Sequence, residues 1–333
     1  MFKNDLLAGQ RILVTGGGTG LGREFTEAYA SLGAEVHICG RRGAVLDETA
    51  AEISENTGGN VFAHATDIRA AGAVDEMVEA IWTDSGPLTG LVNNAAGQIM
   101  SPTDKLSPRG FDAVASTVFH GTYYATHAVG RRWIEQDLTG SVVSILVTWI
   151  WSGSPYVVPS AMSKAGIHAM TKSLAVEWAK YGIRLNAIAP GPFPTEGAWA
   201  RLRPEAKTEG EAKDIARVPM GRYGEMHELR NLAVFLVADG CEYLTGQTIA
   251  IDGAGHLGNG GNYVHLTGRS DEEWDEIKIM AKAASDKDKA QRSAYTVPGG
   301  HICRAFSANP LRSTLPGPAK GSSFITRTRR GCW

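Results

Sequence analysis

Short apolar runs alternate along this chain with longer segments whose apolar residues recur every three or four positions. A short apolar run is typical of a buried strand, whereas the longer period is typical of an amphipathic helix. The segment 23–32, for example, places Phe25, Ala28, Tyr29 and Leu32 on one helical face. Seven predicted strands cover residues 11–15, 35–39, 60–65, 90–93, 141–149, 184–189 and 247–252.

Helices are predicted between most of these strands, at 23–32, 47–55, 73–82, 111–135, 163–180 and 228–237. Strands that alternate with helices form parallel sheets with right-handed crossovers. We therefore expect an α/β fold in which a single domain contains a doubly wound, seven-stranded parallel sheet of the Rossmann type.

One more amphipathic helix is predicted at 270–287, with Ser270 or Asp271 as its N-cap. The expected organisation is a sheet domain over 1–260, a helical extension over 261–292 and a disordered tail over 293–333. The tail carries six basic residues and no acidic one. It is interpreted as an inert appendage or a reading-frame end, although a basic segment can also attract phosphate or a membrane surface.

Net charge, apolar segments and cysteine content limit the partners and the cellular compartment that we expect. The 333 residues have a formal net charge of −2, which gives no indication of a nucleic-acid partner. No apolar segment is long enough for a membrane span or a signal peptide. The four cysteines are scattered and lack the spacing of a disulfide framework or a metal site. We expect a cytoplasmic protein without a metal.

The first predicted strand ends in the turn TGGGTGLG at residues 15–22. In a strand–turn–helix context, Gly16 permits the tight turn, Gly20 lets the backbone approach a pyrophosphate, and Gly22 allows close helix packing. The alternative is a flexible turn that binds no ligand. We expect a dinucleotide to bind through Thr15, Gly16, Gly18, Gly20, Leu21 and Gly22.

The end of the second strand bears on which dinucleotide binds. Proteins that bind NAD place a carboxylate there for the ribose hydroxyls, whereas this chain has Arg41 and Arg42. A guanidinium suits a 2′-phosphate. The cofactor is therefore predicted to be NADP(H), with two solvated surface arginines as the alternative.

Five motifs together resemble the short-chain dehydrogenase/reductase family, over residues 8 to about 255. They are the glycine turn, Asp67-Ile68, the NNAAG segment at 93–97, Lys164 in SAMSK, and PGPFPT at 190–195. The resemblance implies that Asp67 and Ile68 contact the adenine and that the 93–97 segment lines the ribose. It implies further that Lys164 binds the nicotinamide ribose and Thr195 the carboxamide. The expected contacts from these motifs are Asp67, Ile68, Asn93, Ala95, Gly97, Lys164, Pro190, Gly191 and Thr195.

A narrower resemblance is to the 2,4-dienoyl-CoA reductase branch of that family. It rests on IMSPTDKLSP at 99–108, VVPSAMSKAG at 157–166, SLAVEWAKYGIRLN at 173–186 and PGPFPTEGAWARL at 190–202. The resemblance implies a homotetramer and an acyl-CoA or other small-molecule substrate. The segment 195–203, with Trp199, would cover that substrate or form a mobile surface helix.

The positions expected to carry the chemistry depart from the family pattern. The common tyrosine, four residues before Lys164, is Ser160; the usual serine is Val147 and the usual helix asparagine is His120. The dienoyl-CoA reductases share Ser160 and Lys164. Their tyrosine and asparagine, which stabilise the dienolate, correspond to Trp149 and Gln98 here.

Several polar residues could supply the missing functions. Gln98 can donate an amide hydrogen bond to a developing oxyanion. Ser160 is either an active-site hydroxyl or the N-cap of the following helix. His120 and Tyr156 are candidate proton donors. The purely structural alternative is a hydrogen-bonded helix residue for His120 and a hydrophobic loop anchor for Tyr156.

Three functions are compatible with this pattern. The first is an NADPH-dependent reductase of an enoyl-CoA or 2,4-dienoyl-CoA thioester, in which Lys164, Ser160 and Gln98 act on cofactor and thioester. The second is an NAD(P)-dependent alcohol or ketone oxidoreductase that uses His120 or Tyr156 as its acid. The third is a nucleotide-binding protein with little or no catalysis.

Overall fold

The computed structural model describes residues 1–194, 215–258, 266 and 268–293. The chain divides into two units, Met1–Thr267 and Gly268–Trp333. In the second unit, helix α12 covers Asp271–Ser293. Its first turn is capped by Ser270, whose hydroxyl accepts from the Glu273 amide while the Ser270 amide donates to the Glu273 carboxylate. The predicted basic tail beyond Ser293 lies outside the described residues.

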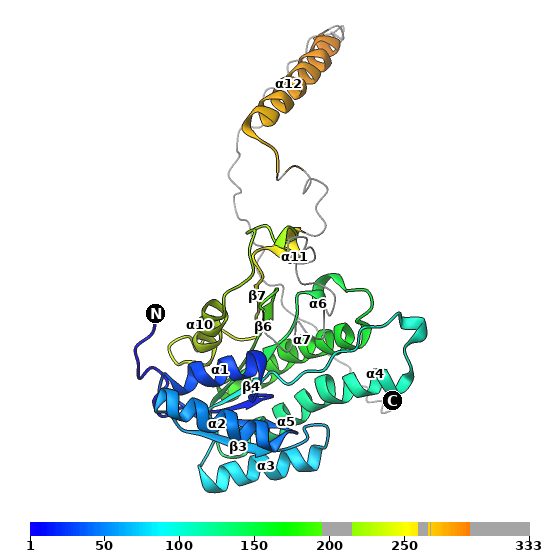
Figure 1. Cartoon of the computed structure of the whole chain (residues 1–333). Helices are drawn as coiled ribbons and strands as arrows, with labels where there is room; N and C mark the ends of the chain where they lie inside the picture. Colours follow the sequence, from blue (N-terminus) through cyan, green and yellow to red (C-terminus); the bar gives the residue numbers. More distant parts are fainter. Residues whose placement is uncertain (195–214, 259–265, 267, 294–333) are drawn as a thin grey trace, which may run out of the picture. The chain divides into compact units, whose positions relative to one another are not determined.

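The first unit contains one parallel sheet of seven strands in the order β3-β2-β1-β4-β5-β6-β7, as expected (Figure 1). Every neighbouring pair is parallel. The strands are β1 Arg11–Thr15, β2 Glu35–Gly40, β3 Val61–Ala65, β4 Gly90–Asn93, β5 Gly140–Ile145, β6 Ile183–Pro190 and β7 Thr248–Ile251. The chain reverses direction across the sheet between β1 and β4, where α/β sheets of this kind open a crevice at their carboxyl edge.

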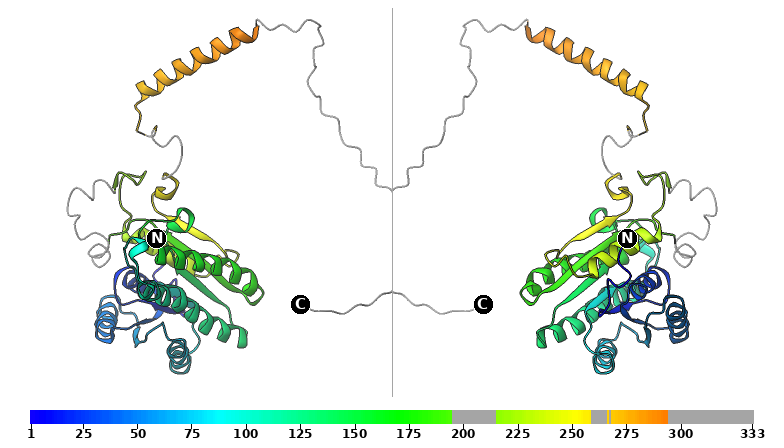
Figure 2. Two further views of the ribbon diagram at one scale, coloured as in Figure 1. Left: turned by 90° about the vertical axis from the view of Figure 1, so that its right-hand side faces the viewer. Right: turned by 90° about the vertical axis from the view of Figure 1, so that its left-hand side faces the viewer.

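Helices cover both faces of the sheet, which forms the middle of three layers (Figure 2). One apolar core lies under α1, α2 and α10; the other lies under α3, α5 and the end of α7. These helices are α1 Gly20–Ala30, α2 Gly43–Thr57, α3 Ala71–Asp84, α5 Gly121–Glu135, α7 Val158–Trp178 and α10 Met226–Val237. Shorter helices are α4 Pro108–Ala115, α6 Trp149–Ser152 and α11 Gly255–Gly258, with 3₁₀ turns at Thr103–Lys105 and Ala179–Tyr181.

Several predicted boundaries differ from the structure. Helix α2 begins at Gly43 instead of residue 47, and α12 continues to Ser293 instead of ending at 287. The strand predicted over 141–149 ends at Ile145, and Trp149 already belongs to α6. The apolar run continues because Leu146, whose amide still donates to the Ile188 carbonyl of β6, is buried in a cluster with Val114 and Ile167. Helix α7 begins at Val158, five residues before the predicted start at 163.

The predicted helix over 111–135 is continuous but changes pitch in its middle. A π turn at Ser116–His120 connects α4 to α5. There the helix lies close to α7, since a Cβ on Gly166 would lie 2.5 Å from the ring of Phe119. Such π turns occur often at functional sites. Among the described residues no helix has the length and apolar character needed to cross a bilayer.

Candidate functional site

The turns after β1 and β4 are joined at the point where the strand order reverses. The Thr15 hydroxyl accepts hydrogen bonds from the amides of Asn94 and Ala95, each at 3.0 Å. The Asn94 side chain donates to the carbonyls of Thr15 and Gly16, at 3.0 and 3.2 Å. The structure therefore brings the glycine turn and the NNAAG segment together at the carboxyl edge of the sheet.

Three glycines give this turn a shape that a larger residue would prevent. Gly16 and Gly20 have φ values of +68° and +55°, a region that L side chains rarely adopt. A Cβ on Gly22 would lie 2.2 Å from the Gly16 carbonyl oxygen. Thr19 precedes α1 without capping it by its side chain, so the first amides of α1 are available to a phosphate. The turn fits a dinucleotide.

Arg41 and Arg42 lie next to this turn, at the end of β2 and the start of α2, and both are exposed. Arg42 Nη2 lies 3.5 Å from the Thr19 hydroxyl. The hydrogen bonds of Arg69, followed by the charges of Arg69 and Arg41, hold the pKa of Asp67 below its usual value. Arg42 thus lies near the glycine turn and Arg41 near Asp67.

Other predicted cofactor residues have additional structural contacts. Ile68 is buried against α5, where a Cβ on Gly121 would lie 2.6 Å from it. Asn93 is turned into the core, and its amide donates to the Thr126 hydroxyl at 2.9 Å. Gly97 faces open space, since a Cβ there would meet nothing within 4 Å. Gln98, which follows it, is exposed.

At the end of β6, Pro190 and Gly191 are placed beside β7, and the Gly191 amide donates to the Ile251 carbonyl at 2.9 Å. Thr195, the predicted carboxamide contact, and the segment 195–203 lie outside the described residues.

Lys164 and Ser160 lie one turn apart on α7, and both are 5% exposed. Lys164 Nζ donates to the Ile145 carbonyl, at the end of β5, over 2.5 Å. Burial lowers the pKa of Lys164 to about 8. Ser160 is inside the first turn of α7, whose N-cap is Val157, so the alternative role of Ser160 as N-cap is excluded. The pair presents a hydroxyl and an ammonium together at a buried position.

The two candidate acids are not hydrogen-bonded to that pair. His120 is exposed, and its ring lies 5.8 Å from Phe119 and 6.1 Å from Tyr124, centre to centre. Tyr156 is 57% exposed and has a φ of +65°. Its carbonyl accepts from the Ser101 amide at 2.9 Å, which ties the loop before α7 to the loop after β4. This contact is made by the backbone, and the exposed Tyr156 side chain does not anchor the loop.

A further polar pair at the same edge of the sheet was missed in the sequence. Asp252 follows β7, and its carboxylate bonds to His256 one turn later on the chain. The four-residue spacing of an aspartate and a histidine directly after the last strand was the available signal.

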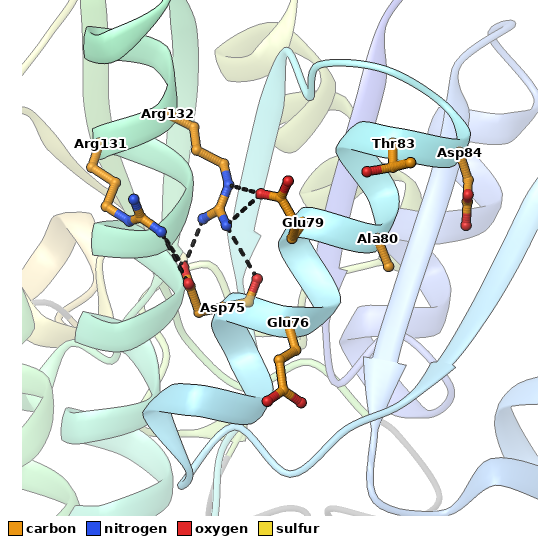
Figure 3. A pocket seen from close by; sticks show the side chains of 8 residues that line it. All are labelled: Asp75, Glu76, Glu79, Ala80, Thr83, Asp84, Arg131 and Arg132. Carbon is orange, nitrogen blue, oxygen red and sulfur yellow. Dashed lines mark hydrogen bonds and ion pairs between the residues drawn. The ribbon is translucent and has the colours of Figure 1, made fainter.

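A wide polar groove between α3 and α5 lies away from these residues (Figure 3). Asp75 pairs with both Arg131 and Arg132, and Arg132 also pairs with Glu79. The two arginines lower the pKa of Asp75 to about 2. Because these charged groups bind one another, the groove is interpreted as a structural ion-pair network that joins the two helices.

Comparisons with known proteins agree with this geometry. The family described as Enoyl-(Acyl carrier protein) reductase matches residues 16–256. A Caenorhabditis elegans protein named Probable 2,4-dienoyl-CoA reductase 3, described as (3E)-enoyl-CoA-producing, is 38% identical over 299 residues, or 87% of this chain and 94% of that protein.

Two crystal structures show the same fold. A short chain dehydrogenase from Bacillus anthracis is 37% identical, with a TM-score of 0.68, and the match covers 76% of this chain and 98% of that one. A gluconate 5-dehydrogenase from Burkholderia cenocepacia, in complex with NADP and tartrate, is 27% identical, with a TM-score of 0.71 and coverages of 76% and 98%. The chain therefore belongs to the short-chain dehydrogenase/reductase family and is an NAD(P)-dependent oxidoreductase.

Proposed function

We propose that this protein uses NADPH to reduce an enoyl-CoA or 2,4-dienoyl-CoA thioester. The observation that carries the proposal is the buried Ser160–Lys164 pair, one helical turn apart at the end of β5. The family's usual phenol is replaced there by a hydroxyl, which is a far weaker acid but still a hydrogen-bond donor. The similarity to a probable 2,4-dienoyl-CoA reductase over 87% of the chain supports the same substrate class.

The cofactor proposed is NADP(H). Arg41 and Arg42 would bind the 2′-phosphate, the glycine turn the pyrophosphate, and Lys164 the nicotinamide ribose. Bound NADPH supplies a hydride. The NADP found in the gluconate 5-dehydrogenase structure is consistent with this assignment.

The chain's own residues would act on the thioester. When a hydride adds to the far carbon of the conjugated system, negative charge develops on the thioester oxygen. The Gln98 amide and the Ser160 hydroxyl would donate hydrogen bonds to that oxygen and so stabilise the charge as it develops. The buried Lys164 ammonium would add favourable charge and hold the ribose in place.

The similarity to a gluconate 5-dehydrogenase favours one second candidate, the oxidoreduction of an alcohol and a ketone. That reaction needs a proton donor for oxygen, and His120 and Tyr156 are the residues first considered for it. Both are exposed and neither is bonded to Ser160 or Lys164 within the described chain. We prefer the thioester reaction because its proposed residues Ser160 and Lys164 are buried and because the probable 2,4-dienoyl-CoA reductase is similar over 87% of this chain.

The test is a rate comparison with purified protein and NADPH. We expect absorbance at the reduced-cofactor band to fall with a 2,4-dienoyl-CoA or an enoyl-CoA, and to stay constant with a panel of ketones and sugar acids. Turnover of ketones alone would replace the first candidate by the second. Tight NADPH binding without turnover of any substrate would instead indicate a nucleotide-binding protein.

A further inference from the structure

The proposed reaction needs a proton donor, and a carboxylate–imidazole pair stands at the same edge of the sheet. Asp252 Oδ2 lies 2.8 Å from His256 Nδ1 and accepts from the His256 amide at 2.7 Å. The Asp252 side chain is 5% exposed and that of His256 is 20% exposed. An ionised carboxylate can only accept a hydrogen bond, so His256 Nδ1 must carry a proton and donate it to Asp252. His256 Nε2 is then the ring nitrogen that can exchange a proton with a substrate.

The position of Asp252 connects this pair to the proposed cofactor-binding residues at the end of β6. Ile251 is paired with Pro190 across β6 and β7. A Cβ on Gly191 would lie 2.6 Å from the Asp252 Cβ. Asp252 thus packs directly on the Pro190–Gly191 segment, where the chain leaves β6 at the carboxyl edge of the sheet.

Trp151 connects the same pair to the end of β5, where Lys164 lies. Its ring stacks on the His256 ring, with 4.8 Å between centres and 30° between planes. Trp151 belongs to α6, which follows the end of β5, where the Ile145 carbonyl receives Lys164. The other side of the cluster is His168, one turn after Lys164 on α7, which meets Trp151 edge to face.

The contacts of His256 hold its ring in one orientation. The Asp252 carboxylate engages Nδ1, and the Trp151 ring covers one face of the imidazole. His168, the second imidazole against Trp151, has a partner of its own, since its Nδ1 is engaged by the Thr248 hydroxyl at 2.9 Å.

We propose that His256, oriented by Asp252 and Trp151, is the proton donor of this site. The assignment rests on the proposed function. As the hydride adds to the δ-carbon of the dienoyl thioester and NADPH becomes NADP⁺, the displaced electron pair moves toward the thioester. The imidazolium gives its Nε2 proton to the α- or γ-carbon, and the neutral ring takes a proton from solvent.

The test compares His256→Gln, Asp252→Asn and the matched control His168→Gln, which removes the other imidazole from Trp151. We expect His256→Gln to lower kcat by about 10²–10⁴-fold while the Kd for NADPH changes by less than about twofold. His168→Gln should keep kcat within about threefold. Free imidazole should restore part of the activity of His256→Ala.

A second substitution separates a chemical role from a structural one. Because the Asp252 carboxylate accepts from His256 Nδ1, Asp252→Asn should lower kcat by at least about tenfold while KM and the Kd for NADPH stay within about twofold. A pair that only caps α11 would lower the melting temperature and leave kcat unchanged, which would overturn the proposal. A wild-type protein without any turnover would refute the proposed function itself, whereas equal turnover by wild type and His256→Gln would refute the His256 assignment alone.

Discussion

At the scale of single residues, Lys164 shows how stability and function oppose each other. Its ammonium is almost fully buried and donates to one backbone carbonyl, an arrangement that costs desolvation energy. The same burial lowers the pKa of Lys164 to about 8. A group held at such cost is typical of a functional site, in agreement with the expected binding of the ribose.

The charge of Lys164 gives a pH-dependent prediction. Since the folded pKa is about 8, the ammonium is present below that pH and is lost as the pH rises through it. We expect NADPH affinity, measured by fluorescence from pH 6.5 to 9.5, to weaken across this range. Lys164→Met should bind at least about tenfold more weakly at low pH and show no such step. The matched control is Lys172→Met at an exposed position of α7, which should keep the loss of affinity near pH 8. If Lys164→Met also kept that loss, Lys164 would not be the group responsible for it.

The proposed preference for NADPH can be tested at Arg41. Replacing Arg41 by Asp puts a like charge beside the 2′-phosphate, so we expect the Kd for NADPH to rise by about 10–100-fold and that for NADH to change little. As a control, Lys180→Asp makes the same change of charge in the 3₁₀ turn Ala179–Tyr181 that follows α7. Equal losses for the two cofactors would show that Arg41 does not read the phosphate.

At the scale of elements, the strands and helices followed from hydrophobic spacing, but their ends did not. The apolar run after β5 indicated a longer strand because Leu146 is buried just past the end of β5. The start of α7 was hidden because Val158 and Pro159 are not residues of high helix propensity, although proline suits a first turn. The Asp252–His256 pair was missed because it follows the last recognised motif and becomes informative only once Trp151 is seen against it.

The junction of β1 and α1 can be tested through its glycines. Gly22→Ala would place a methyl group 2.2 Å from the Gly16 carbonyl, so the turn must shift. We expect a loss of about 1–3 kcal/mol in the free energy of unfolding and at least tenfold weaker NADPH binding. Gly72→Ala on α3 meets nothing within 4 Å and should be neutral or stabilising by up to about 1 kcal/mol. Unaltered NADPH binding by Gly22→Ala would refute the close packing.

Strands β2 and β3 carry a pair of histidines, of which His37 is buried and His64 half-buried. His37 Nδ1 and His64 Nε2 lie 2.9 Å apart, and His37 Nε2 lies 3.0 Å from Glu35. Burial lowers the pKa of His37 and lowers that of His64 to about 4. The unfolded chain, with histidine pKa values of about 6.5, therefore binds more protons than the folded one between these values.

The free energy of unfolding should consequently fall as the pH drops from about 6.5 to 4, by up to about 1.4 kcal/mol per pH unit for each such site. Urea unfolding at several pH values measures this slope. We expect His64→Gln to reduce the slope and His127→Gln, at an exposed position on α5, to preserve it. An identical slope in His64→Gln and wild type would exclude this pair as its source.

At the scale of the whole molecule, the first unit contains the sheet and every described site residue. The fold class, strand number and cofactor crevice were predictable because spacing, turn chemistry and family motifs agree over residues 8 to about 255. The residues that act on the substrate were not predictable in the same way, because Ser160, Gln98 and Trp149 depart from the family pattern. Sequence spacing also does not reveal which side chains meet across β5, α6 and β7.

The two-unit organisation predicts that the second unit is not needed for catalysis. A chain ending at Thr267 should bind NADPH and turn over its substrate within about twofold of the full chain, because the described cofactor and catalytic residues all precede that point. Light scattering on both chains would also test the homotetramer expected from the family resemblance. Loss of cofactor binding on truncation would show that the second unit completes the site.

The most direct test of the central claim follows the hydride itself. A single turnover of a 2,4-dienoyl-CoA with NADPH labelled with deuterium at the transferable C4 position, followed by mass spectrometry and NMR of the product, locates the label. We predict one deuterium on the δ-carbon of an enoyl-CoA, with one NADPH consumed for each product formed. Recovery of unlabelled dienoyl-CoA, or of deuterium on an alcohol carbon with a ketone substrate only, would contradict the account.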